Sequence, residues 1–249
     1  MDFVVKKLRQ ARRLCGLVGV FVFAGLDYFF RGGKKMGSRA RAQWLMRSSA
    51  LMLKTTGYRI KVCGNIPDGG FIAPNHLSYM DIVVLASVAP QVFLSKKEVG
   101  DWPVVGAYTR MAGTLYIDRE RRGDVATKEE SFAKVIEAGL NMTFFLEGTS
   151  TDGRAVLPFR ASLLQPVVAN EWPVTPAYLR YECEGGDVAQ DVCWWGDMGF
   201  ASHLFRMFTL KKVRATVMFG EKRKPGNDRK RLAKELYDEV LGLEASVQR

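Results

Sequence analysis

The sequence is poor in residues that bind metal ions or form disulfide bonds: its 249 residues include only two histidines and four cysteines. The cysteines form no Cys-x-x-Cys pair and have no metal-ligand spacing relative to the histidines. These absences argue against a zinc site and against a disulfide scaffold, so no metal is expected, and they favour a reducing cytosolic environment. The cysteines are Cys15, Cys63, Cys183 and Cys193.

The sequence also lacks internal repeats and low-complexity tracts, which argues against a solenoid, and its hydrophobic content of 47% argues against a disordered chain. A chain of this length can bury a substantial core in one large domain of about 200 residues. We therefore expect an N-terminal membrane-associating helical segment over residues 1–56 and one main domain over residues 57–249.

Acidic residues are scarce at two places, and these explain the formal net charge of +11. Residues 1–41 and residues 211–234 each hold ten Lys and Arg against two acidic residues, so each stretch has a net charge of +8 and the remainder −5. This distribution predicts docking on an anionic membrane surface, where each basic group contributes roughly 1 kcal/mol. The alternative is that both stretches form ordinary solvated faces.

The apolar run Leu14–Phe30 is 17 residues long and contains Asp27, whereas a membrane span needs about 20 residues. A cleaved signal peptide is not expected, because the Ala-x-Ala sequence at 40–42 lies far beyond the run among charged residues. Basic residues on both flanks predict a helix that lies in, or dips into, one leaflet. A second apolar stretch, Trp44–Thr55, would pair with it as a helical hairpin; the alternative is an ordinary core helix.

From residue 58 onward, short β-rich runs alternate with helical patterns, which predicts an α/β domain with a central, mostly buried mixed sheet flanked by helices. In such sheets, binding groups lie at strand ends. The predicted helices lie near 81–89, 103–112, 123–139 and 227–241, and the predicted strands are Tyr58–Cys63, Gly70–Pro74, Val92–Ser95, Thr114–Asp118, Met142–Leu146 and Arg214–Phe219.

His76 follows one of these strands, and Asp81 comes five residues later at the start of a predicted helix. An imidazole can act as a general base near neutral pH, and a carboxylate behind its second nitrogen fixes the tautomer. The spacing works only if residues 77–79 form a turn. The alternative for His76 is a structural histidine. Ser78 and Asp81 also fit a capping box that begins the helix, a role for Asp81 that is compatible with catalysis.

Four ordered blocks resemble the glycerolipid acyltransferase family typified by bacterial lysophosphatidate acyltransferases, and they cover roughly residues 60–180. The first block contains the His-x4-Asp pair, and the third is close to Phe-Pro-Glu-Gly-Thr-Arg. The blocks are Asn75–Asp81 (NHLSYMD), Gly113–Arg119 (GTLYIDR), Phe145–Ser150 (FLEGTS) and Val174–Leu179 (VTPAYL).

The resemblance implies that His76 and Asp81 are catalytic and that Arg119 binds the acceptor phosphate. Gly148 would let the backbone approach a ligand closely, with Thr149 beside it, and Glu147 would accept from acceptor hydroxyls or help to orient its neighbours. Pro176 is expected to support the site from a strand end, and Lys96, with Lys97 beside it, to contact an anionic group. One departure stands out: Ser150 occupies the position where phosphatidate-forming members commonly have Arg, so Arg119, Arg154 or Arg160 would have to replace that cation.

By this resemblance the chain is an O-acyltransferase that moves a fatty acyl group from acyl-CoA or acyl carrier protein to a lysophospholipid hydroxyl, without a cofactor. The expected acceptor is 1-acyl-sn-glycerol-3-phosphate, with a lyso-ornithine lipid as the alternative. The expected location is the cytoplasmic face of the cell membrane. Backbone N–H groups at the helix start after His76 are expected to stabilise the oxyanion.

The sequence disfavours two other functional classes. A serine hydrolase or thioesterase would use Ser150, but the sequence around it lacks the second glycine of a Gly-x-Ser-x-Gly elbow. A nucleic-acid-binding module would use the basic stretches, but the aromatic residues are not interleaved with them, so no nucleic-acid partner is expected. His203 is expected to be structural. The aromatic residues that would stack on nucleic-acid bases are Trp194, Trp195, Phe200 and Phe205.

Overall fold

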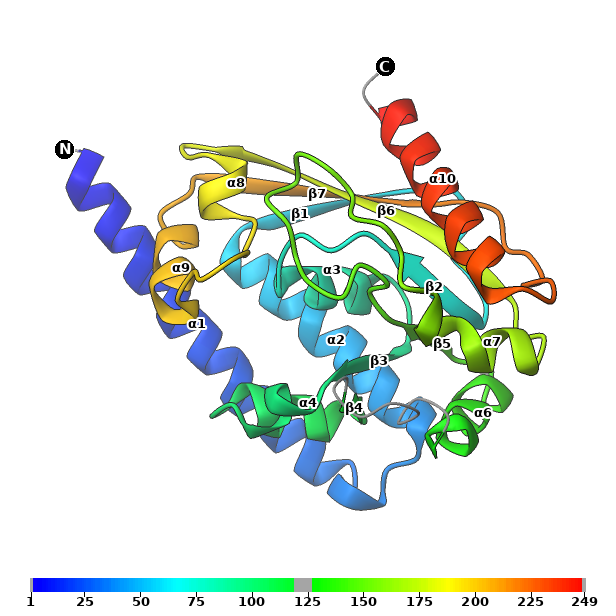
Figure 1. The fold of residues 1–249 in the computed structure, drawn as a ribbon. Coiled ribbons are helices and arrows are strands. Elements are labelled where there is room, and N and C mark those ends of the chain that lie inside the picture. The colour runs from blue at the N-terminus through cyan, green and yellow to red at the C-terminus, as the bar shows by residue number, and fades with distance from the viewer. Residues whose placement is uncertain (1, 119–126, 248–249) are drawn as a thin grey trace.

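The computed structural model describes residues 2–118 and 127–247, which form an α/β domain with a long N-terminal helix (Figure 1). Among the described residues, seven strands form one sheet in the order β1-β7-β6-β2-β5-β3-β4. The strands are β1 (Tyr58–Cys63), β2 (Gly70–Pro74), β3 (Gln91–Lys96), β4 (Leu115–Ile117), β5 (Asn141–Thr143), β6 (Val174–Glu184) and β7 (Lys212–Phe219).

The sheet is mixed, as expected, because β6 and β7 are antiparallel while the other neighbouring strands are parallel. Helices cover it on both faces. These are α1 (Asp2–Phe30), α2 (Ser38–Thr56), α3 (Met80–Val88), α4 (Val105–Ala112), α6 (Glu129–Glu137), α7 (Gln165–Ala169), α8 (Val188–Asp191), α9 (Phe200–Met207) and α10 (Arg229–Val247), with 3-10 turns η1 (Gly33–Lys35), η2 (Lys97–Asp101) and η3 (Ala161–Leu164).

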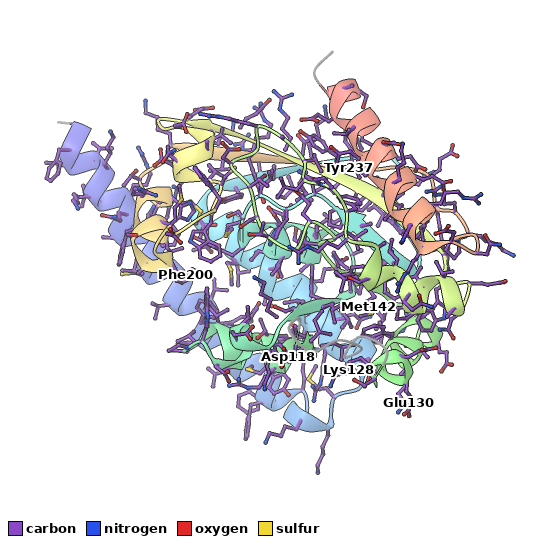
Figure 2. All side chains as sticks on the ribbon, viewed as in Figure 1. Asp118, Lys128, Glu130, Met142, Phe200 and Tyr237 are labelled. Carbon is purple, nitrogen blue, oxygen red and sulfur yellow. The ribbon has the colours of Figure 1, made fainter. Side chains whose placement is uncertain are left out.

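Two hydrophobic cores flank the sheet because side chains alternate between its faces. In β2, Ile72 joins the core beneath α1, α2 and α3, whereas Phe71 and Ala73 join the core beneath α6 and α10. Tyr237 of α10 (labelled in Figure 2) packs against this second core, and its ring lies edge-on to Phe159. Burial on both faces explains why these strands read as nearly continuous apolar runs.

Most predicted elements are confirmed to within a few residues, with two informative differences. The predicted strand Met142–Leu146 ends at Thr143, because the chain then turns toward the end of β2. The longest strand, β6, was not predicted as a strand, since Pro176 lies inside its sequence and proline disfavours a central strand. The sheet accommodates Pro176 because pairing with β7 begins only at Ala177.

The predicted helical hairpin is present: α1 and α2 run side by side and are joined by a short connection (Figure 1). By length and composition, α1 is the one described helix that would be able to cross a membrane. One of its faces packs on the domain through Leu17, Val20 and Ala24. The opposite face exposes large apolar side chains along its length, among them Leu8, Val18, Val22, Phe23, Leu26, Phe29 and Phe30. α2 buries Trp44 and Leu45 in the same core as the sheet.

Arg13 ties α1 to the body of the protein. Its side chain is buried, and its guanidinium donates hydrogen bonds to the carbonyls of Phe208, Leu210 and Lys211, which follow α9. Burial, with the neighbouring Arg9, lowers the pKa of Arg13 to about 10, so it stays charged at neutral pH. A Cβ at Gly57 would lie 2.0 Å from one guanidinium nitrogen, so only glycine fits beneath this arginine.

We expect Arg13→Ala to destabilise the fold by about 3 kcal/mol, because three buried carbonyls lose a charged donor. For a chain of this size the apparent melting temperature should fall by about 6–12 °C in differential scanning fluorimetry. Arg12→Ala is the matched control, since Arg12 is exposed, and should change the melting temperature far less. Equal effects of the two substitutions would contradict this role for Arg13.

Candidate active site

His76 lies in the connection between β2 and α3, Asp81 lies in the first turn of α3, and the two side chains are in direct contact. Asp81 is fully buried, and its Oδ2 atom lies 2.8 Å from His76 Nδ1. The same oxygen accepts the N–H groups of Leu77 (2.6 Å) and Ser78 (2.9 Å). The predicted turn is therefore present, and the carboxylate that contacts the ring also fixes the backbone that carries it.

Tyr181, from β6, completes the surroundings of Asp81. Its hydroxyl donates to Asp81 Oδ1 over 2.6 Å, and its ring is buried. Burial and the adjacent carboxylate raise the pKa of Tyr181 well above its ordinary value, so the phenol remains a donor. No local sequence pattern predicts this contact, because Tyr181 lies 100 residues from Asp81 along the chain.

Only half of a capping box forms at this helix start. Asp81 accepts the Ser78 N–H, as the reciprocal half of a capping box requires. The Ser78 hydroxyl, however, is buried and has no hydrogen-bond partner among the described residues. The carboxylate of Asp81 therefore serves the helix start and His76 together.

Phe145 fixes the plane of the His76 ring. The two rings are stacked, with centroids 3.9 Å apart and an interplanar angle of 16°. The His76 side chain is 19% exposed, so the ring is not sealed in the interior. When Nδ1 donates to Asp81, Nε2 carries the lone pair that can accept a proton.

The Glu147 carboxylate holds the backbone of His76 in place by a hydrogen bond. Its Oε1 accepts the His76 N–H over 2.5 Å, and its Oε2 accepts the Leu157 N–H over 2.7 Å. Burial raises the pKa of Glu147 to about 7, although both hydrogen bonds oppose this shift. Its predicted contact with an acceptor hydroxyl stays a prediction.

Backbone N–H groups that lead into α3 are already engaged. The N–H group of His76 donates to Glu147, and those of Leu77 and Ser78 donate to Asp81. Their physical task is to stabilise two buried carboxylates. Oxyanion stabilisation by the N–H groups of Tyr79 and Met80, where α3 itself starts, stays a prediction.

A cavity of about 600 Å³ opens beside His76 and extends between α1, α2, α3, α4 and α9. Most of its lining is apolar. Aromatic side chains gather on one side, where Trp194 and Phe200 both lie edge-on to Trp102 (Figure 2 labels Phe200). Polar residues lie near His76 and at the end of β3; they include Lys96, Gly148, Thr149 and Ser150.

Gly148 has a positive φ of 80° and lies directly beneath the Arg160 side chain, since a Cβ at this position would be 2.7 Å from the guanidinium carbon. A cation therefore lies against Gly148, two residues before Ser150, the position where the family commonly has Arg. The Ser150 hydroxyl donates to the Trp194 carbonyl, an arrangement that does not resemble a nucleophile paired with His76.

The other residues singled out from the sequence do not all lie at the cavity. Lys96 and Thr149 line the cavity, as expected for residues that contact a ligand. Pro176 packs against Gly220 and is not among the described residues that line it. Arg119 lies outside the described residues. His203 is buried, bonds the Tyr79 hydroxyl through Nδ1 over 3.0 Å, and has its pKa lowered to about 4 by burial, so it is neutral.

Comparisons with known proteins agree with this geometry. The Acyltransferase family model matches residues 59–180, which include His76, Asp81 and Glu147. A 1-acyl-sn-glycerol-3-phosphate acyltransferase of Neisseria gonorrhoeae is 31% identical over 84% of this chain and 82% of its own. A lyso-ornithine lipid O-acyltransferase of Brucella abortus is 32% identical over 78% of both chains.

The fold is also similar to a solved structure. The crystal structure of a 1-acyl-sn-glycerophosphate acyltransferase from Thermotoga maritima superposes with a TM-score of 0.70 over 98% of both chains, at 19% identity. At this identity the likeness supports the fold alone. Taken with the two relatives and the family match, it leads to one conclusion: this chain belongs to the acyltransferase family of lysophospholipid acyltransferases.

Proposed function

We propose that this enzyme transfers a fatty acyl group from acyl-CoA or acyl carrier protein to the free hydroxyl of 1-acyl-sn-glycerol-3-phosphate, giving phosphatidate. The observation that carries the proposal is the His76–Asp81 pair at a large apolar cavity. The pair supplies a base for an alcohol, and the cavity suits an acyl chain.

In the proposed reaction, Nε2 of His76 removes the proton from the acceptor hydroxyl as its oxygen attacks the thioester carbonyl. Asp81 stabilises the imidazolium that forms. The tetrahedral intermediate then collapses, the carbon–sulfur bond breaks, and the thiolate takes the proton back from His76. The acyl group passes directly to the acceptor, so no acyl-enzyme forms.

The proposed phosphate site lies at Arg160 and Lys96. Arg160 covers Gly148, one of the residues that line the cavity, and Lys96 lies on the cavity at the end of β3. A guanidinium offers paired donors that suit phosphate oxygens. Arg119 remains a further proposed contact on the basis of sequence alone.

A lyso-ornithine lipid is the second candidate acceptor. Ser150 favours it, because the hydroxyl is turned toward the Trp194 carbonyl and supplies no charge to a phosphate. The relatives from Neisseria and Brucella, which have these two different acceptors in their names, are almost equally similar to this chain.

Membrane association is supported by the exposed apolar face of α1. The opposite face of the helix is fixed to the body of the protein, where Arg9 donates to the Thr209 carbonyl and Trp44 donates to the Ala24 carbonyl. We propose that α1 lies along one leaflet rather than across the bilayer, at the cytoplasmic face. The active site would then stand at the surface where the acceptor and the product are dissolved.

His76→Ala should lower kcat/KM by about 100-fold or more, because the general base is lost, while the melting temperature stays near that of the wild type. The measurement is transfer of a labelled acyl group to lysophosphatidate. Ser150→Ala is the control and should retain activity. If Ser150→Ala were inactive and His76→Ala active, a serine nucleophile would replace this mechanism.

Arg160→Gln should raise KM for 1-acyl-sn-glycerol-3-phosphate about tenfold or more, because a charged hydrogen bond to phosphate is lost. Arg154→Gln, at an exposed position, is the matched control. The two variants and the wild type should be assayed with lysophosphatidate and with a lyso-ornithine lipid. A wild type that prefers the ornithine acceptor, with no effect of Arg160→Gln, would favour the second candidate.

Tyr181→Phe should lower kcat/KM about tenfold, because the buried Asp81 Oδ1 loses the hydrogen bond from the phenol and the carboxylate that orients the His76 ring is held less firmly. The measurement is transfer of a labelled acyl group, together with the melting temperature of the variant. Tyr178→Phe is the matched control, since its hydroxyl bonds Glu244 and not Asp81. Equal loss of activity in the two variants would contradict this role for Tyr181.

A further inference from the structure

A second groove, of about 820 Å³, lies between α1, the C-terminal half of α2, β1 and the start of β7. It shares no lining residue with the cavity beside His76. Six basic side chains and one acidic side chain line it, so its net charge is +5. The basic residues are Arg12, Arg13, Lys54, Arg59, Lys211 and Lys212, and the acidic residue is Glu184.

The two basic stretches of the sequence meet in this groove. Several basic residues between 222 and 234 form ion pairs outside the groove: Lys222 pairs with Asp68, Arg223 with Glu235, and Lys234 with Asp238. Lys211 and Lys212 instead line the groove together with Arg12 and Arg13, and Arg13 donates to the Lys211 carbonyl. Of the groove's six cations, Lys212 alone has an ion pair within the described parts of the chain, at 3.9 Å from Glu184.

The groove has a charged end and an apolar end. The cations surround Gly57 and Tyr58, where β1 begins, and the lining continues along β1 through Ile60 and Val62 to Ile66 and Val88. From residue 58 to residue 62 the strand covers roughly 13 Å. This arrangement suits an amphiphile with an anionic head and a hydrocarbon chain better than it suits a small soluble anion.

The groove also opens on the side of the molecule that carries apolar surface. Arg12 is exposed one helical turn from Leu8, which belongs to the exposed apolar face of α1. At the apolar end, Val62 and Ile66 are 38% and 47% exposed. A ligand in this groove would therefore reach it from the bilayer along with the docking of α1.

We propose that this groove is a second lipid site that binds an anionic glycerophospholipid of the bilayer. The phosphate lies among Arg12, Lys54 and Arg59, and one acyl chain follows Ile60, Val62 and Ile66. Charge attraction and burial of apolar surface both favour this occupant. Arg13, which three backbone carbonyls hold in place, adds a fixed positive charge at the inner wall.

The test is photo-crosslinking of the full chain on phosphatidylcholine vesicles that contain phosphatidylglycerol with a diazirine in one acyl chain, followed by peptide mapping. We expect labelling of residues 59–66 as well as of α1. In Lys54→Glu/Arg59→Glu, labelling of residues 59–66 should fall about tenfold or more, because two of the cations that attract the phosphate are replaced by carboxylates. Labelling of α1 should persist.

Lys224→Glu/Lys230→Glu is the matched control, since it changes the charge equally at exposed positions outside the groove and should leave both labels unchanged. Acyl transfer by the groove variant in detergent micelles should stay within about twofold of wild type, as expected for an independent site. Equal labelling by photoreactive phosphatidylcholine would overturn the proposal. So would competition by free glycerol 3-phosphate, or undiminished labelling of the groove variant.

Discussion

The buried charge of Asp81 is the constraint on which the candidate site depends. A carboxylate removed from water is costly unless donors surround it, and here four donors do so. Three come from consecutive residues of the loop between β2 and α3, so the loop, the imidazole and the charge fix one another. The fourth comes from β6, which pairs with β2. The register of two central strands therefore sets the position of the His76 ring.

The parts of the site that local sequence encodes were predictable. His76 and Asp81 are five residues apart, and the strand before them and the helix after them are clear from periodicity. Tyr181 was not predictable in the same way, because its contact with Asp81 depends on how β6 pairs with the sheet. That strand was itself concealed by Pro176, whose usual exclusion from central strands is relaxed at the edge of the β6–β7 ladder.

The net charge of each basic stretch could be predicted from the sequence, but the ion pairs that its residues form could not. The two stretches carry equal net charge, yet many residues of the second stretch form ion pairs with carboxylates on β6 and α10. Arg214, for example, pairs with Glu182 across the β6–β7 ladder, and Arg231 pairs with Glu235 one turn along α10. Since the partners come from distant elements or from helical spacing, only the folded chain reveals which cations remain at a surface.

The same segment of helix α1 lines the cavity beside His76 with one face and exposes apolar side chains with the other. Leu17, Val18 and Phe21 form part of the wall of the cavity beside His76, while Val18 and its outward neighbours are exposed. The same helix thus carries exposed apolar surface and forms a structural wall of the cavity. A shortened chain made without this helix, to gain solubility, would lose that wall, and under the proposed function it would lose the lining that keeps water away from the thioester.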